Sequence, residues 1–184
     1  MKTKDITQIA LTVALIIVLG LLPAIPLGII PVPIVLQNMG IMLTGLILGP
    51  KKGTISIAIF MLLVAIGMPI LTGGNGGLAV FIGPTCGYLL AWLLTPCMIS
   101  ILKKTANNFK NTYVQYLIIW LLIIVVDLIG SIGLSIQSKM PLQLAIYSNF
   151  IFIPGDTVKL FIAIFVSKRL QKNDSIDAKK MTRK

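Results

Sequence analysis

The sequence predicts an all-α integral membrane protein, and three observations support this prediction. Of the 184 residues, 57% are hydrophobic and 11% are charged, whereas soluble domains have about 25% charged residues. The apolar runs are long and do not alternate with polar residues, which favours helices over a β-barrel. The basic residues form short clusters between these runs. We expect a six-helix membrane domain over residues 1–170, followed by a basic cytoplasmic tail over residues 171–184.

The first half of the chain predicts three helices and an apolar loop. A first helix is expected over residues 6–22, where the apolar run ends at a proline, and no cleavage site for a signal peptide follows it. Residues 23–37 contain further prolines, which exclude a helix and predict a loop folded back into the protein. Two short helices are expected over residues 37–48 and 53–67, and the pair Gly49-Pro50 separates them.

The second half predicts three more spans. A loop rich in glycine and proline over residues 68–85 precedes a helix over residues 84–102. After a polar loop, a helix is expected over residues 113–136. Residues 137–142 turn the chain, and the final span is expected to end at residue 166. We expect the basic segment after it to be partly disordered.

The distribution of lysine predicts the orientation in the cell membrane. With six spans, both termini lie on the same side, and that side collects most of the basic residues, including Lys51, Lys52, Lys103 and Lys104. Basic loops are typically cytoplasmic, so we expect both termini in the cytoplasm. The loops over residues 23–37 and 68–85, neither of which contains a charge, then lie at the outer face.

Asp156 and Lys159 lie in an apolar span, where ionisable residues are rare. A charge at the bilayer centre costs at least about 2.5–3.5 kcal/mol, so it usually faces a partner, a cavity or a solute. The i, i+3 spacing places both side chains on one face of a helix. Alternatively, Asp156 caps a helix and Lys159 extends to the interface. Because Lys159 lies about 13–14 Å along a helix from Lys168, the interface is too far away. We expect the pair to contact a solute, with a structural ion pair as the alternative.

Four other features are candidates for the same site or for helix packing. The loop G-G-N-G-G over residues 73–77 exposes backbone amides, and Asn75 can bind a solute; a flexible surface loop is the alternative. Asp127, a third ionisable residue within a span, is either neutral or paired with Lys159. Gln37 and Asn38 either line a cavity or cap a helix. Ala10 and Ala14 are small residues one turn apart, which permits close helix packing.

The composition disfavours several classes of function. Histidine is absent, and Cys86 and Cys97 are too far apart for a short metal or redox motif. No Gly-Lys-Ser/Thr follows the glycines of residues 73–77, so they are not a nucleotide-binding loop. The net charge of +11 is distributed as membrane loops require and does not indicate nucleic acid. We therefore expect no enzyme, no metal and no cofactor.

Four motifs occur in order along the chain. They are Q-N-x-G-I-M-L-T-G-L-I-L-G-P-K-K-G (37–53), A-I-G-M-P-I-L-T-G-G-N-G-G (65–77), G-P-T-C-G-Y (83–88) and F-I-P-G-D-T-V-K (152–159). Together they resemble the BioY family, the biotin-binding S components of energy-coupling factor (ECF) transporters. The resemblance covers about residues 5–170.

This resemblance implies a six-helix bundle of the ECF S-component type that binds biotin at its outer face. Its expected partners are a transmembrane coupling subunit and two ATPase subunits, which use ATP in place of this chain. Ala10 and Ala14 resemble the surface on which S components dock. The substrate-binding residues that we predict from the residues and from the resemblance are Gln37, Gly73, Gly74, Asn75, Gly77, Tyr88, Asp127, Asp156 and Lys159.

The chain departs from the family pattern at two positions. Cys86 stands where a glycine is expected, with Gly87 retained, and Asp127 stands where a neutral residue is expected.

The alternatives to a biotin-binding S component are an S component for another vitamin, or a carrier that works without ATPase subunits. A membrane-embedded enzyme is disfavoured because the usual catalytic motifs are absent.

Overall fold

The computed structural model describes residues 2–28 and 30–181, with side chains described as far as residue 172. Within these residues the protein is helical and contains no β-strand. The elements are α1 (Thr3–Gly20), α2 (Gln37–Ala65), the short 3-10 helix η1 (Leu78–Ile82), α3 (Cys86–Ala106), α4 (Thr112–Ser138), α5 (Leu142–Asn149) and α6 (Phe152–Met181).

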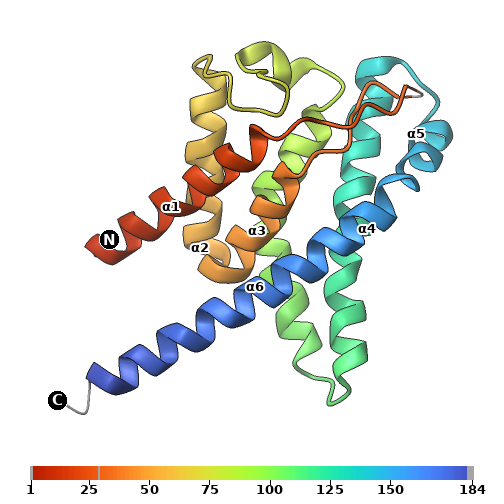
Figure 1. Ribbon diagram of the computed structural model, residues 1–184. Coiled ribbons are helices and arrows are strands. Elements are labelled where there is room, and N and C mark those ends of the chain that lie inside the picture. Colours follow the sequence, from red (N-terminus) through yellow and green to blue (C-terminus); the bar gives the residue numbers. More distant parts are fainter. Residues whose placement is uncertain (1, 29, 182–184) are drawn as a thin grey trace.

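The helix α2 consists of two helices joined by a sharp turn at Gly49. Gly49 has φ 71° and ψ −169°, a left-handed conformation that favours glycine, and Pro50 follows it. The chain reverses direction there, so the second part of α2 runs back beside the first (Figure 1). The predicted break at Gly49-Pro50 is thus confirmed, and the six predicted spans correspond to α1, the two parts of α2, α3, α4, and α5 with α6.

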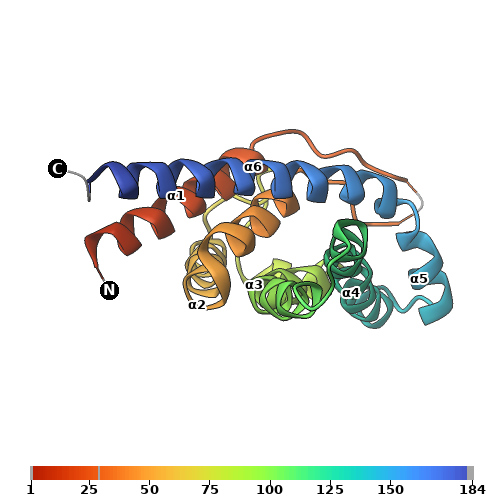
Figure 2. The same cartoon turned by 90° about the horizontal axis from the view of Figure 1, so that it is seen from below.

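The helices form two layers. The helices α2, α3 and α4 stand in a row, and α1 and α6 lie across the same side of that row (Figure 2). One apolar cluster joins α1, α2 and α3, and a second joins α2, α3, α4 and α6. The helices α3 and α4 approach closely at two glycines, because a Cβ atom on Gly133 would lie 2.5 Å from the backbone nitrogen of Gly87. Large apolar side chains cover the outward faces of the helices, as expected for contact with lipid.

The last predicted span is broken rather than continuous. The helices α5 and α6 are bent by 49° relative to each other at residues 150–151. Pro154 and Gly155 lie inside the first turns of α6, which begins at Phe152, so the interpretation of Asp156 as a helix cap is wrong. Proline is tolerated near a helix start because the first backbone N–H groups have no partner within the helix. The helix continues to Met181, into the predicted tail, whose residues 182–184 lie outside the described residues.

The helices have the lengths and apolar character of membrane spans. Among the described residues, four helices are long and apolar enough to cross a membrane, or five if α5 and α6 together form one span. Both ends of the described chain, the turn at Gly49 and the loop between α3 and α4 lie at one end of the molecule (Figure 1). The loops over residues 21–36 and 66–85 lie at the other end. This polarity agrees with the expected separation of lysine-containing turns from uncharged loops.

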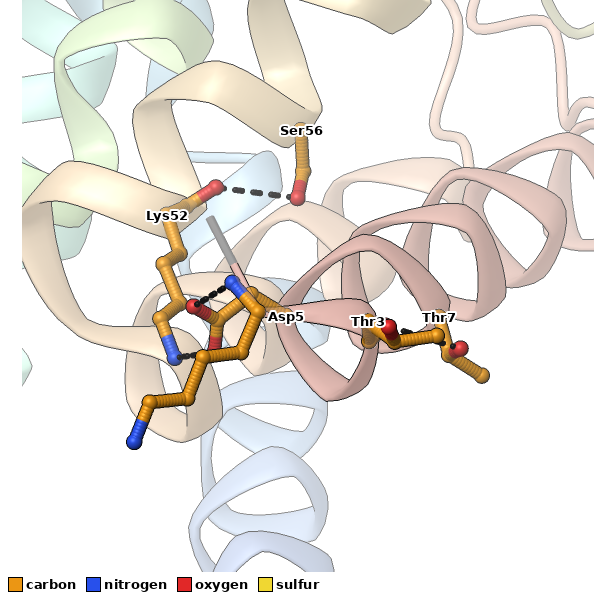
Figure 3. Close-up of polar contacts among 6 residues, drawn as sticks. Thr3, Asp5, Thr7, Lys52 and Ser56 are labelled. Carbon is orange, nitrogen blue, oxygen red and sulfur yellow. Dashed lines mark hydrogen bonds and ion pairs between the residues drawn. The ribbon is translucent and has the colours of Figure 1, made fainter.

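Polar contacts attach α1 to the second part of α2. The Asp5 carboxylate forms an ion pair with Lys52, which lies just after the turn at Gly49 (Figure 3). The same carboxylate accepts a hydrogen bond from the backbone nitrogen of Lys2. About two turns further along α1, the buried Thr12 hydroxyl lies 3.2 Å from the Ser56 hydroxyl. The first helix is therefore fixed to α2 by polar contacts as well as by apolar packing.

Candidate binding site

A cavity of about 460 Å³ lies beneath the two uncharged loops. This volume falls in the range of about 300–1,000 Å³ that is usual for small-molecule sites. Most of its surface is apolar, with polar groups contributed by a few side chains. It is lined by residues 31–35, by Gln37 and Asn38 of α2, by Leu71, Thr72, Asn75, Gly76, Ala79, Val80, Gly83, Pro84 and Thr85 of the second loop, by Tyr88, Leu89 and Trp92 of α3, by Val126 and Asp127 of α4, and by Phe152, Asp156 and Lys159 of α6.

Asp156 and Lys159 form a buried ion pair in the cavity wall. Each is 5% exposed, and Lys159 Nζ lies 2.8 Å from Asp156 Oδ1. The ammonium also donates to the carbonyl oxygen of Val35 at 2.7 Å, so it does not extend to an interface. Asn38 Nδ2 donates to Asp156 Oδ1 at 3.0 Å. These contacts leave one ammonium hydrogen and the second carboxylate oxygen of Asp156 free of any described hydrogen bond.

Two other acceptor atoms beside this pair are buried without a hydrogen-bond partner among the described residues. They are Asn38 Oδ1 and Asp127 Oδ2. A buried polar atom without a partner costs about 1–3 kcal/mol, so native proteins rarely contain one without a functional or structural reason. Asp127 does not form the predicted alternative ion pair with Lys159 within salt-bridge distance. This end of the cavity therefore offers more acceptors than donors.

Gln37 lines the cavity, but its amide is occupied by the protein. Nε2 donates to the carbonyl oxygens of Ile16 and Ile70 at 3.1 and 2.9 Å. Oε1 accepts from the backbone nitrogen and the hydroxyl of Thr72, each at 3.2 Å. The side chain is 0% exposed, and both donors and both acceptor positions of the amide are used. The structure thus places Gln37 as the residue that joins the end of α1 to the start of the second loop.

The glycine-rich segment forms a tight turn at the cavity edge. Leu71 and Asn75 are bridged by backbone hydrogen bonding, and Gly73 and Gly74 have φ values of 82° and 71°. Gly77, with φ 86°, ends the turn before η1. Asn75 lines the cavity and donates to the carbonyl oxygen of Thr72 at 3.1 Å. The predicted Gly73, Gly74 and Gly77 do not line the cavity; their positive φ values shape the turn that carries Asn75.

Tyr88 lines the cavity from α3, and residues of three other helices fix its position. Its hydroxyl donates to Asn149 Oδ1 at the end of α5. Its ring packs edge to face against Phe152 with centroids 6.2 Å apart. On α4, a Cβ atom on Gly130 would lie 2.1 Å from the ring, so the absence of a side chain there makes room for Tyr88.

Among the wall groups that were not predicted, three bear on the chemistry of the site: the Trp92 ring, the Asn38 amide and the Val35 carbonyl. Trp92 lies one helical turn after Tyr88, and this i, i+4 aromatic spacing was a signal that could have identified it. Asn38 was expected, like Gln37, either to line a cavity or to cap a helix, but only Gln37 was placed among the substrate-binding residues. The Val35 carbonyl contacts Lys159 through the backbone, and the residue type carries no signal for such a contact.

Ala10 and Ala14 lie away from the cavity. Both are exposed on the outer face of α1, as is Leu11 between them. Since both alanines are exposed, the structure does not bury the A-x-x-x-A step against another part of this chain. The step instead forms a shallow surface of the kind on which a second membrane helix can pack closely.

The arrangement can bind a solute that is largely apolar and has several hydrogen-bond donors at one end. The residues with described side chains contain no group of three or more His, Cys, Asp or Glu side chains that could hold a metal ion. Asp127, Asp156 and Lys159 are buried, and charge-assisted hydrogen bonds are strong in such surroundings. These features are those of a binding site.

Comparison with known proteins agrees with this interpretation. The family model described as "BioY family" matches residues 1–175. The chain is 50% identical to the biotin transporter BioY of Lactococcus lactis subsp. cremoris, over 96% of this chain and 95% of the relative. It is 38% identical to the biotin transporter BioY of Rhizobium etli, over 91% of this chain and 93% of the relative.

A solved structure has the same architecture. It is the 2.1 Å crystal structure of the S-component for biotin from an ECF-type ABC transporter. The two chains are 47% identical, the TM-score is 0.86, and the match covers 94% of this chain and 95% of that chain. The all-helical fold predicted from the sequence is confirmed.

Proposed function

The chain belongs to the BioY family, and from this premise we propose that it binds biotin and acts as the substrate-specific membrane subunit of a biotin importer. It is a multi-pass membrane transport protein. The named relatives are biotin transporters, and the similar solved structure is an S-component for biotin. The single structural observation that carries the proposal is the largely apolar cavity with an acceptor-rich polar end.

The chemistry of biotin matches the two parts of this cavity. Biotin has an apolar ring and chain, a ureido group with two N–H donors and one acceptor oxygen, and a carboxylate. The free acceptor atoms of Asp156, Asn38 and Asp127 can accept from ureido N–H groups, and the third hydrogen of Lys159 can be donated to the ureido oxygen. Apolar lining residues such as Leu89, Trp92 and Phe152 can cover the rings.

The same electrostatics support placing the biotin carboxylate away from this end. Asp127 and Asp156 stand beside a single lysine, and a third carboxylate there would be repelled. Near the loop that contains Asn75 there is no acidic residue in the cavity wall, and Asn75 can donate a hydrogen bond. We infer that the ureido end enters toward α6 and the carboxylate remains near the second loop.

We propose that the protein works in the cell membrane with both termini in the cytoplasm. The lysine-containing turns and the termini lie at the end opposite to the cavity loops, which supports an outward-facing cavity (Figure 1).

The expected partners are a transmembrane coupling subunit and two ATPase subunits. The ATPase subunits would use ATP, since this chain has no phosphate-binding motif. The exposed Ala10 and Ala14 on α1 support this helix as the docking surface.

Equilibrium binding of biotin to the purified protein tests the function and the site together. The wild type is expected to bind saturably with a Kd below micromolar. Asp156→Asn and Lys159→Ala should each weaken binding by about 10- to 150-fold, because each removes a charge-assisted hydrogen bond of about 1.5–3 kcal/mol. Ile162→Ala, on the exposed face of the same helix, is the matched control and should leave the Kd unchanged.

The possible failures are distinguishable. No saturable binding by the wild type would contradict the proposed function. Biotin binding that is unchanged in both Asp156→Asn and Lys159→Ala would leave the function intact and contradict the assigned site.

A further inference from the structure

The orientation of the Asn149 side chain follows from what it contacts. Asn149 ends α5, is 4% exposed, and one atom of its amide lies 2.6 Å from the carbonyl oxygen of Asp127. A carbonyl oxygen only accepts hydrogen bonds, so the amide nitrogen must face it. The same nitrogen donates to the Ser131 hydroxyl, which itself donates to Asp127 O at 2.9 Å. Both amide hydrogens of Asn149 are therefore used on α4.

This orientation determines the direction of the next hydrogen bond. With the nitrogen facing α4, the amide oxygen of Asn149 faces the Tyr88 hydroxyl. A hydrogen bond between two oxygen atoms requires a hydrogen on one of them, and the amide oxygen of Asn149 carries none. The single hydroxyl hydrogen of Tyr88 is thus directed to Asn149. Toward any other group, the Tyr88 oxygen can therefore only accept a hydrogen bond.

We propose that Asn149 is a positioning residue that makes the Tyr88 hydroxyl an obligate hydrogen-bond acceptor toward the ligand. This inference rests on the proposed function and concerns ligand selectivity. A Tyr88 hydroxyl that can only accept favours a ligand N–H and disfavours a ligand carboxylate at the same place. Asn149 is absent from the wall of the binding cavity and instead borders a separate cavity of about 80 Å³ between α4, α5 and α6. It acts through Tyr88 and does not itself touch the ligand.

The surrounding packing keeps this hydrogen bond in one geometry. The Tyr88 ring has backbone against it at Gly130 and the Phe152 ring at its edge. Asn149 and Phe152 lie on the two sides of the α5–α6 break. The break therefore places the Asn149 amide beside the Tyr88 hydroxyl and the Phe152 ring beside the Tyr88 ring. With the ring held so, the hydroxyl cannot turn to another acceptor without breaking the bond to Asn149.

The donor role of Tyr88 can be measured without any ligand. The Raman intensity ratio of the tyrosine Fermi doublet falls when a phenol donates a strong hydrogen bond and rises when it accepts one. The difference spectrum between the wild type and Tyr88→Phe isolates this residue from the other tyrosines. We expect a donor signature in the free protein and a shift toward the acceptor signature when biotin saturates the site. An acceptor signature in the free protein, or no shift at saturation, would overturn the proposal.

A double-mutant cycle tests whether Asn149 acts through Tyr88. Tyr88→Phe and Asn149→Leu should each weaken biotin binding by about two- to tenfold, the range for one hydrogen bond. The double variant should be no weaker than the weaker single variant, because both changes remove the same interaction. Losses that multiply would show that Asn149 acts independently of Tyr88 and would overturn the proposal.

Two further variants complete the test. Ser148→Ala is the matched control, since the Ser148 hydroxyl bonds the Leu144 carbonyl of its own helix, and it should leave affinity unchanged. If Asn149→Leu fails to fold, Asn149→Ala replaces it in the cycle with the same expectations. If the wild type does not bind biotin, the proposed function fails, while the spectrum of the free protein still decides the donor assignment.

Discussion

The Lys159 ammonium donates a hydrogen bond to the Val35 carbonyl oxygen at 2.7 Å, so a buried cation in α6 holds the loop that covers the cavity. The two residues are 124 positions apart in the sequence. The same ammonium pairs with Asp156 and has one hydrogen left for a ligand. Ligand binding and loop position therefore depend on the same group. This dual role makes Lys159 the most informative residue to change.

Replacing Lys159 alone should destabilise the protein more than replacing the whole pair. Lys159→Met leaves the Asp156 carboxylate buried without its cation, which typically costs about 3–5 kcal/mol. The double variant Lys159→Met with Asp156→Asn removes both charges and should recover part of that loss. Thermal unfolding in detergent measures both. A double variant that unfolds at or below the temperature of Lys159→Met would contradict the pairing.

Gln37→Leu should loosen the second loop and lower stability. The change leaves the buried Thr72 backbone nitrogen and the Ile70 carbonyl without their described partner, each worth about 1–3 kcal/mol. Hydrogen exchange should become faster at Thr72 in the absence of biotin. Gln143→Leu makes the same chemical change at an exposed position of α5 and is the control. Equal exchange rates in the two variants would show that Gln37 does not hold the loop.

Gly133→Ala should destabilise the protein, whereas Gly155→Ala should not. A Cβ atom on Gly133 meets the backbone of Gly87, so α3 and α4 must separate, at a cost of about 1–3 kcal/mol. At Gly155, in α6, nothing lies within 4 Å of the added atom, and alanine is the better helix former. Unfolding temperatures of the two variants give the comparison. A neutral Gly133→Ala would mean that the helices are not in close contact there.

Ala14→Trp should prevent assembly with the coupling subunits while leaving biotin binding unchanged. Indole on the exposed face of α1 blocks the close helix approach that small residues allow. Ile132→Trp adds the same bulk to the exposed face of α4 and is the control. Co-purification in mild detergent measures assembly. Ala14→Trp protein that still co-purifies with the coupling subunits would exclude this surface as the docking site.

The sequence allowed the helices to be predicted well, because their limits depend on local chemistry. Runs of apolar residues defined the spans, and Gly49-Pro50 defined the turn within α2. The break between α5 and α6 was missed, since Phe150 and Ile151 are as apolar as the helices on either side. The alternative in which Asp156 caps a helix was wrong, because proline inside the first turn and proline before a helix look alike in sequence.

The cavity wall was partly predictable. Asp156 and Lys159 are conspicuous because charges are rare in an apolar span. Gln37 was identified by its position, but sequence could not show that Ile16, Ile70 and Thr72 would occupy its amide. Such contacts depend on how distant segments fold together. For the same reason the binding roles of Asn75, Tyr88 and Asp127 stay predictions.

The attachment of α1 has a mechanical consequence. It is bonded to α2 near its start through Asp5 and Lys52, in its middle through Thr12 and Ser56, and near its end through Ile16 and Gln37. Because α1 is attached to α2 at three positions along its length, we expect it to move as a rigid unit and not to bend. The last fastening is the Gln37 amide, which also holds the second loop at Thr72. A displacement of α1 can therefore reach the rim of the cavity through the Gln37 side chain as well as through the loop that follows α1.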